Sequence, residues 1–354
     1  MRKIGIERVH AGDRLAKSIY INNRLLLSAG MSLTPEFIER LKKLGYCAVY
    51  INDGRIDDVV IDDAISEQTR NQAVRCIREL TEDIKHHRTI KVVSLKKTVS
   101  DIIDDLVDSR EMMLSLADIR SFDDYTFQHS INVTIISIMI GMAMYYTQDK
   151  LRDLGLGVLL HDIGKTQVPS EIINKPSRLT EEEFEVVKKH TWHGFELLRH
   201  NPEIKTTSAH VALQHHERVD GTGYPRGLTG KGILEFARIS TIADVFDALS
   251  NDRAYRKKMT TYQVYQFLLE KSGTYFDSEI LDKFIQKITL YPQGTKVILN
   301  DGRSGFVIKQ NPFAPKQPIL RLFWDVTGKE FPKPVEVNLI CEPSLKIYDV
   351  LEQN

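Results

Sequence analysis

The chain has few cysteines and no excess of either charge. It has three cysteines in 354 residues, Cys47, Cys76 and Cys341, and none of them forms a CxxC pair. Their odd number and wide scatter predict reduced thiols in a cytoplasmic protein, not a disulfide-stabilised one. Lysine plus arginine equals aspartate plus glutamate at 48 each, so the formal net charge is zero. This balance argues against a broad surface for polymeric nucleic acid, although it leaves room for a local basic pocket.

The sequence also lacks a long apolar run. Its N-terminus begins Met-Arg-Lys-Ile-Gly-Ile-Glu and has no apolar signal core. The longest apolar run, residues 131–146, is shorter than the roughly 20 residues that cross a bilayer. Asn132, Thr134 and Ser137 interrupt it. We therefore expect a buried core helix here and no membrane span.

The first third of the chain divides into two segments. Residues 1–65 alternate short strand patterns with one helix pattern, which starts at the N-cap Thr34 followed by Pro35. They predict a small α+β domain that could be regulatory. Residues 66–116 are charged, helical in period and poor in glycine and proline. They predict a helical connector or hairpin, which could pack against a second subunit in a homodimer.

The remainder also divides into two segments. Residues 117–290 carry repeated helix patterns and no alternating run long enough to suggest a sheet. After residue 291 strand patterns return, and Asp301-Gly302 is typical of a hairpin turn. The expected fold is therefore mostly α, a helical bundle over 117–290 with a small N-terminal α+β unit and a small β appendage over 291–354.

The residues that could carry chemistry lie in the helical segment. His161 and Asp162 are adjacent and directly follow an apolar run. Side chains on consecutive residues normally point apart, so we do not expect a simple salt bridge, but both could ligate one metal cluster. Imidazole and carboxylate groups without nearby thiols suit iron, manganese, zinc, nickel or copper. Five histidines and two aspartates form this set: His129, His161, Asp162, His190, His215, His216 and Asp244.

Two metal ions about 3.5–4 Å apart, with a shared water, would use such a set economically. Two cations acidify a shared water enough to make it a nucleophile near neutral pH. Asp162 could bridge both ions. Asp244 lies within the apolar stretch 242–249, where a buried carboxylate needs a partner, and either a salt bridge or a metal would provide one.

A single histidine on an amphipathic helix is more often packed or exposed than it is a ligand. We apply that interpretation to the six remaining positions, His10, His86, His87, His193, His200 and His210. The coincidence of several imidazole and carboxylate groups in one segment favours a metal centre for the other set.

The stretch from His215 to Pro225 indicates a family. Together with His161-Asp162, its tripeptide Gly223-Tyr224-Pro225 resembles the HD-GYP subgroup of the HD-domain phosphohydrolases. The resemblance covers residues 117–290, roughly half of the chain. Further matching motifs are Lys175-Pro176, Leu179-Thr180, His190 with Gly194, Gly227-Leu228 and Ile242 to Leu249.

The resemblance implies a helical bundle around a centre of two or three metals that hydrolyses cyclic di-GMP. Carried over by position, it implies the same seven ligands. Family members with three metals carry a glutamate four residues before the first histidine, where this chain has Tyr125. A phenol is a poorer ligand than a carboxylate, so we expect two divalent ions, with iron or manganese as the leading candidates. The departure leaves open whether the product is the linear dinucleotide pGpG or GMP.

The resemblance also implies catalytic and substrate-binding residues beside the catalytic ligand Asp162. Lys165 and Asp247 match a lysine–aspartate pair, in which Lys165 could neutralise phosphate charge or donate a proton and Asp247 could orient it. An ordinary helix-end charge is the alternative for Lys165. Substrate contacts are implied for four residues, Tyr224, Gly223, Arg253 and Arg256. A solvated basic turn is the alternative for the two arginines.

The sequence thus predicts a cytoplasmic cyclic di-GMP phosphodiesterase. One alternative is a regulator that binds cyclic di-GMP, or recruits a protein partner through the loop of Tyr224, with little turnover. Another is a hydrolase of a different cyclic dinucleotide, such as cyclic GMP-AMP. These alternatives stay open on the sequence alone.

Overall fold

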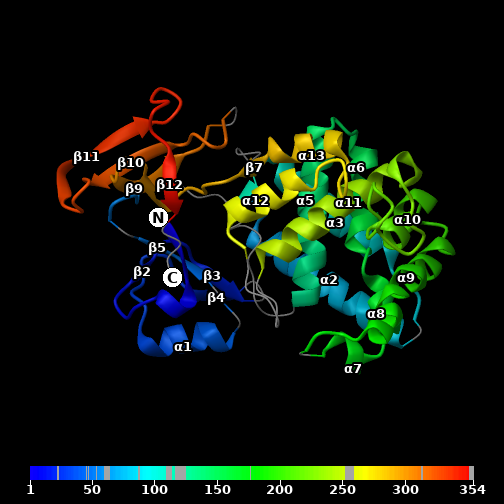
Figure 1. Cartoon of the computed structure of the whole chain (residues 1–354). Coiled ribbons are helices and arrows are strands. Elements are labelled where there is room, and N and C mark those ends of the chain that lie inside the picture. The colour runs from blue at the N-terminus through cyan, green and yellow to red at the C-terminus, as the bar shows by residue number, and fades with distance from the viewer. Residues whose placement is uncertain are drawn as a thin grey trace. The chain divides into compact units, whose positions relative to one another are not determined.

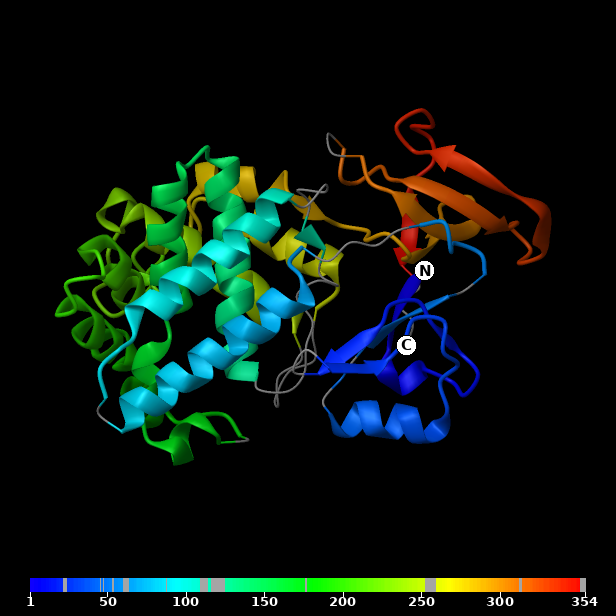
Figure 2. The same ribbon diagram turned by 180° about the vertical axis from the view of Figure 1, so that it is seen from behind.

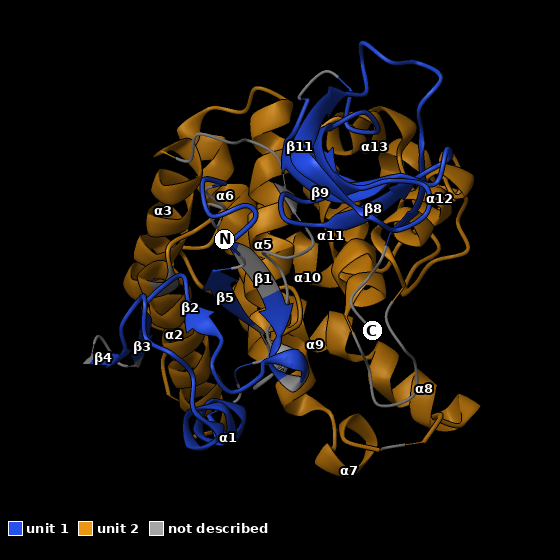
Figure 3. Ribbon diagram, turned by 90° about the vertical axis from the view of Figure 1, so that its left-hand side faces the viewer, with its two compact units in different colours: residues 1–63, 113–123, 288–354 blue, residues 64–112, 124–287 orange. Residues whose placement is uncertain are grey.

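The computed structural model describes most of the chain: residues 1–21, 24–44, 46, 48–52, 54–59, 64–86, 88–108, 114–115, 125–175, 177–251, 259–311 and 314–350. The chain forms two compact units, coloured separately in Figure 3. Unit 1 contains residues 1–63, 113–123 and 288–354, and unit 2 contains residues 64–112 and 124–287. The four segments expected from composition therefore gather into two bodies, one of which is built from both ends of the chain.

Unit 2 is helical throughout (Figure 1). Its elements are α2 (Glu67–Lys85), α3 (Val92–Asp108), α5 (Tyr125–Ala143), α6 (Gln148–Leu159), η2 (Ile163–Gln167), α7 (Ser170–Ile173), α8 (Glu181–Lys188), α9 (His190–Arg199), α10 (Thr206–Gln214), η3 (Gly230–Gly232), α11 (Glu235–Ser250), α12 (Thr261–Glu270) and α13 (Ser278–Ile285). The mostly helical fold with two small β-containing parts is confirmed.

Helix α5 is the central element of unit 2. Every residue from 129 to 140 is buried, because α5 packs against α2, α3, α6, α11 and α13. A helix that is apolar on all sides needs such a complete cover. The predicted core helix is confirmed. No helix among the described residues is both long enough and apolar enough to cross a membrane.

Helices α2 and α3 form a hairpin whose two arms lie side by side (Figure 2). Helix α2 starts at the N-cap Ser66, whose hydroxyl accepts a hydrogen bond from the backbone N–H of Thr69. Its arm packs on α5, while α3 packs on α6. The expected connector is thus an integral part of unit 2.

The N-terminal part of unit 1 contains β1 (Arg2–Gly5), η1 (Ile6–Arg8), β2 (Arg14–Leu15), β3 (Ile19–Ile21), β4 (Arg24–Leu27), α1 (Pro35–Lys43) and β5 (Ala48–Asn52). Strands β1, β5 and β2 form one antiparallel sheet and β3 and β4 form a second. The predicted helix start is confirmed, because the Thr34 hydroxyl accepts a hydrogen bond from the N–H of Phe37 at 3.3 Å.

The C-terminal part contains β7 (Ile288–Thr289), β8 (Lys296–Leu299), β9 (Ser304–Lys309), β10 (Ile319–Trp324), β11 (Glu330–Asn338) and β12 (Ile347–Val350). Strands β8 to β12 form one sheet in the order β11-β10-β9-β8-β12, and β7 pairs with β6 (Leu114–Ser115) in parallel. Gly302 has φ +90 in the β8–β9 turn, as the Asp-Gly signal predicted.

The two ends of the chain share a core inside unit 1. Tyr50, Ile56 and Val59 pack against Phe306 and Phe323 in one buried cluster. At its edge the Arg321 guanidinium donates to both carboxylate oxygens of Asp58 at 2.8 Å each. Such bidentate pairs fix orientation as well as charge.

A candidate binuclear metal centre in unit 2

Seven residues from five places in unit 2 meet at one buried point. His129 comes from α5, and Asp244 comes from α11. His161 and Asp162 occupy the turn between α6 and η2, while His190 begins α9. His215 caps the end of α10, and His216 follows it. Their ligand atoms form two groups, one of Asp162, His190, His215 and His216 and one of His129, His161 and Asp244, with the atoms of each group within 4.8 Å of one another.

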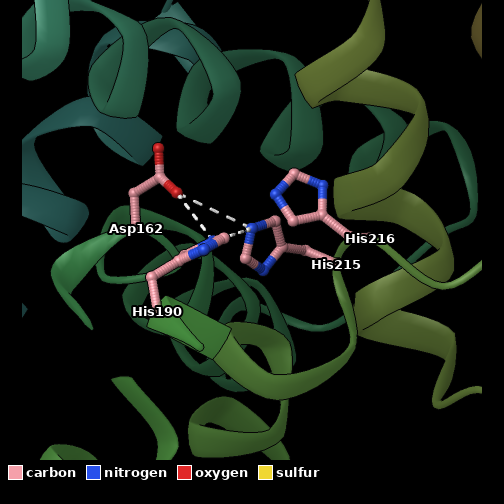
Figure 4. Close-up of side chains that lie close together, drawn as sticks. All are labelled: Asp162, His190, His215 and His216. Carbon is pink, nitrogen blue, oxygen red and sulfur yellow. Dashed lines mark hydrogen bonds and ion pairs between the residues drawn. The ribbon is translucent and has the colours of Figure 1, made fainter. Parts of the chain in front are cut away.

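In the first group, two imidazoles face one carboxylate oxygen of Asp162 (Figure 4). Asp162 Oδ1 lies 3.5 Å from Nε2 of His190 and 3.7 Å from Nε2 of His215. The two imidazole nitrogens lie 3.4 Å from each other. Three ligand atoms directed at a common point are what one cation requires.

The second carboxylate oxygen of Asp162 faces the other group. Asp162 Oδ2 lies 3.5 Å from Nε2 of His161 and 3.8 Å from Nε2 of His129. His129 Nε2 is in turn 3.1 Å from Asp244 Oδ1. Asp162 therefore lies between the two groups with one oxygen toward each, which is the arrangement that the bridging role requires.

Two ligand atoms at this point are buried without a hydrogen-bond partner. They are His161 Nε2 and Asp162 Oδ1. An unsatisfied polar atom in the interior is costly, and a cation removes that cost by accepting the lone pair. The donor set contains only imidazoles and carboxylates. The residues therefore fit a divalent metal centre.

Backbone carbonyl groups orient three of the imidazoles. Nδ1 of His161 lies 2.7 Å from Val158 O, and Nδ1 of His190 lies 2.6 Å from Val187 O. Nδ1 of His215 lies within 3.1 Å of two carbonyl oxygens of α10. An N–H that donates from Nδ1 leaves Nε2 with its lone pair free, so each ring presents the atom that ligates a metal.

Burial keeps two of these rings neutral. It lowers the pKa of His161 to about 3 and that of His190 to about 4. Burial also holds the pKa of His216 well below its usual range. A neutral imidazole is the form that binds a cation. Ligation by these rings therefore requires no loss of a proton at neutral pH.

His129 differs from the other histidines. Burial opposes its charged form, but hydrogen bonds to Asp244 and Asp247 raise the pKa of His129 to about 9. Nδ1 of His129 lies 2.6 Å from Asp247 Oδ2, and Asn132 and Asn251 donate to Oδ1 of the same carboxylate at 2.9 and 3.0 Å. A carboxylate behind a histidine is a common support for a metal ligand.

This arrangement corrects one expectation. We expected Asp247 to orient Lys165, whereas Lys165 Nζ donates to Asp162 Oδ2 at 2.5 Å and Asp247 supports His129. The reason is helical spacing. Asp162 and Lys165 are three residues apart across η2, and Asp244 and Asp247 are three residues apart on α11, so each pair faces one direction.

The loop of the family tripeptide lies against the candidate metal ligands. The Tyr224 ring packs on the His216 imidazole with centroids 4.7 Å apart. Burial first, and then the carboxylates of Asp244 and Asp162, raise the pKa of Tyr224. Its hydroxyl therefore stays protonated and can donate a hydrogen bond. At Gly223 a Cβ would meet three backbone atoms of residues 216–218 at 2.4–2.5 Å, so only glycine allows this close approach.

Glu217 holds this loop, and sequence reasoning missed it. Its side chain is 1% exposed, and its two carboxylate oxygens accept from the N–H groups of Arg226 and Leu228 at 2.8 and 2.9 Å. A charged residue directly after His215-His216 was the available signal, because the two ligands require a buried environment. Glu217 joins the ligand segment to the far side of the loop.

We expect Glu217→Gln to lower the free energy of unfolding by about 1–3 kcal/mol. The amide has one acceptor oxygen and places an NH₂ group against a backbone N–H, which leaves a buried donor unsatisfied. Denaturant unfolding of the whole chain measures the difference. Asp220→Asn is the matched control, since Asp220 is exposed in the same loop and its Oδ1 accepts from Thr222. Equal stability of both variants would contradict a stabilising role for the two hydrogen bonds that Glu217 accepts.

Three expectations concern residues without a described side chain. Arg253 and Arg256, the implied phosphate or guanine contacts, lie outside the described residues, and so does the side chain of Tyr125. Of the six histidines that we did not favour as ligands, the five that are described lie outside both groups: His10, His86, His193, His200 and His210.

Comparison with known proteins agrees with this site. A family model described as an HD domain matches residues 99–280, just over half of the chain, and a KOW domain associated with HD domain matches residues 296–354. A cyclic di-GMP phosphodiesterase of Pseudomonas aeruginosa is 33% identical over 280 residues, which are 77% of this chain and 67% of the relative. A cyclic di-GMP phosphodiesterase of Thermotoga maritima is 34% identical over 201 residues, 55% of this chain and 54% of the relative.

A relative with another named substrate also matches. A 3′3′-cGAMP-specific phosphodiesterase of Vibrio cholerae is 36% identical over 168 residues, which are 48% of this chain and 36% of the relative. The chain thus spans between about one third and two thirds of the length of these curated relatives. The matched HD-domain region contains all seven residues of the two groups and the Gly223-Tyr224-Pro225 loop. The chain therefore belongs to the HD-domain family, in its HD-GYP subgroup.

Proposed function

We propose that this protein is a metal-dependent phosphodiesterase that hydrolyses cyclic di-GMP to the linear dinucleotide pGpG, with GMP as the alternative end product, and so lowers the level of this second messenger. The observation that carries the proposal is the position of Asp162 between two groups of ligand atoms in an HD-GYP protein. Relatives named as cyclic di-GMP phosphodiesterases support the choice of substrate.

We assign the seven residues as ligands of two divalent ions, iron or manganese. The division of the ligand atoms into two groups supports two ions. Imidazole and carboxylate ligands without thiolate suit both metals. When bound, such a pair of ions neutralises phosphate charge and acidifies the attacking water.

The residues of the chain supply the remaining chemistry. In hydrolysis a water oxygen bonds to phosphorus, the bond from phosphorus to the ribose 3′ oxygen breaks, and that oxygen leaves with a proton. Lys165 is one third exposed at the edge of the centre, so its ammonium group can neutralise phosphate or deliver this proton. The protonated Tyr224 hydroxyl can donate to a phosphate oxygen or to guanine. Arg253 and Arg256 complete the proposed substrate contacts.

The first test is anaerobic turnover of cyclic di-GMP by the full chain. Metal-free protein is reconstituted separately with ferrous iron and with manganese, and products are resolved by chromatography. We expect metal-dependent formation of pGpG or GMP and none in a chelator-treated control. Intact nucleotide at full metal occupancy would contradict the enzyme and leave the alternative of a cyclic di-GMP-binding or partner-recruiting regulator that acts through the Tyr224 loop.

Cyclic GMP-AMP is a second candidate substrate, because the Vibrio cholerae relative is specific for it. Competition between the two nucleotides in one turnover assay separates these candidates, since the preferred substrate is consumed first. We place the activity in the cytoplasm, which the scattered cysteines support. A homodimer through the α2–α3 hairpin stays a prediction that the sedimentation behaviour of the full chain tests.

A further inference from the structure

A series of hydrogen-bonded side chains, here called the polar chain, runs from helix α2 to the metal ligand His129. Its members are Arg70, Asn132 and Asp247. Its first member, Arg70, lies in the first turn of α2, and its Nη1 donates to Asn132 Oδ1 of α5 at 2.9 Å. A cation in the first turn is on the unfavourable side of the helix dipole. Arg70 is therefore poorly placed for the stability of α2 itself, and its contact with α5 offers a reason for the position.

Asn132 links Arg70 to Asp247. It is 2% exposed and interrupts the apolar face of α5, where an amide needs partners. Its Nδ2 donates to Asp247 Oδ1 at 2.9 Å, while its Oδ1 accepts from Arg70. The two ends of an amide are a donor and an acceptor, so the Arg70 donor fixes which end faces Asp247. A flipped amide would place its oxygen against the carboxylate.

Asp247 completes the chain at the metal centre. It is fully buried, and its Oδ2 lies 2.6 Å from Nδ1 of His129. The ring then presents Nε2 toward Asp244, with which His129 forms one of the two ligand groups. In the other group, of Asp162, His190, His215 and His216, backbone carbonyl groups orient the rings of His190 and His215. Among the described contacts, His129 is the ligand whose ring nitrogen meets Asp247.

We propose that Arg70 is a positioning residue of the metal centre, which orients His129, one member of the ligand group of His129, His161 and Asp244, through Asn132 and Asp247. The inference rests on the proposed function, since it takes the two groups as sites for cations. It gives the α2–α3 hairpin a part in the metal centre, beyond the connecting or dimerising role expected from its sequence. Replacement of a residue that supports a metal ligand typically lowers metal affinity by about 10–100-fold. We expect a loss of metal affinity of that order when Arg70 is replaced.

The test measures manganese binding by the metal-free full chain with equilibrium dialysis. We expect two ions in the wild type. Arg70→Ala should weaken one of them by about 10–100-fold and leave the other within about twofold. Arg70→Lys keeps the charge but not the planar fork, so we expect an intermediate loss. In a His129→Ala background, Arg70→Ala should have no further effect, because both act on the same group.

The matched control is Arg78→Ala. Arg78 also joins α2 to α5, with its guanidinium 5.9 Å from the Phe127 ring centroid. If Arg70 contributes only to helix packing, both variants will lower the unfolding temperature and leave the two ions bound as in the wild type, or weaken both equally, and the proposal is overturned. A wild-type chain that binds no manganese or iron would instead overturn the metal centre and, with it, the proposed function.

Discussion

Replacing Asp162 with asparagine is expected to remove both metal ions and to lower turnover of cyclic di-GMP by at least about 10³-fold, roughly 4 kcal/mol of transition-state free energy. One carboxylate oxygen faces His190 and His215, and the other faces His161 and His129. Asparagine has no charge, and one of its two terminal atoms is an NH₂ group that cannot ligate. Both groups therefore lose a ligand in one substitution. Metal content by mass spectrometry and steady-state turnover are the two measurements.

Two control variants test whether the loss of both ions is specific to Asp162. Asp149→Asn makes the same chemical change at a side chain that is 85% exposed and paired with Arg152, and we expect it to keep both ions. His216→Ala removes a ligand from one group only, so we expect it to lose one ion and keep the other. An Asp162→Asn protein that holds two ions and turns over near the wild-type rate would remove Asp162 from its bridging role.

The gathering of the candidate ligands could be predicted because several of them stand out locally. His161 and Asp162 are polar residues directly after an apolar run, and Asp244 is a carboxylate inside one. Each such residue needs a compensating partner once it is buried. The family tripeptide then connected these separate positions. Local pattern also predicted α5 and the start of α1, since apolar period and capping are properties of neighbouring residues.

The partners behind the ligands could not be predicted in the same way. Nothing near Asp247 in the sequence shows that it faces His129 and not Lys165, because they come from different helices. The link from Arg70 to Asn132 spans 62 positions. The place of Glu217 directly after two candidate ligands indicates burial, but it does not show that the partners are the N–H groups of Arg226 and Leu228. Such contacts depend on how helices pack, which a local pattern does not contain.

The same limit applies to unit 1. Residues 50–59 and the strands β9 and β10 each read as separate small elements. Their shared core of Tyr50, Phe306 and Phe323 joins parts of the chain more than 250 positions apart. Composition could divide the chain at residues 65 and 291, but it could not show that the outer segments fold together.

Gly223→Ala is expected to lower turnover by about 10²-fold while most of unit 2 stays folded. The added Cβ would lie 2.4 Å from the backbone nitrogen of Arg218 and 2.5 Å from His216 O. Both distances are too short for a real contact, so the backbone has to shift. The loop must then move away from the segment that carries His215 and His216. Tyr224, whose ring packs on His216, moves with it, and the substrate loses its proposed contact.

Gly232→Ala is the matched control, because no heavy atom of the described chain lies within 4 Å of where its Cβ would be. The methyl group is added in the same connection between α10 and α11, but it meets open space, so we expect turnover within about twofold of the wild type. Overpacking at Gly223 should also cost about 1–3 kcal/mol of unfolding free energy. If Gly223→Ala loses that stability but keeps wild-type turnover, the loop is a structural support for His216 and Tyr224 makes no contact on which the reaction depends.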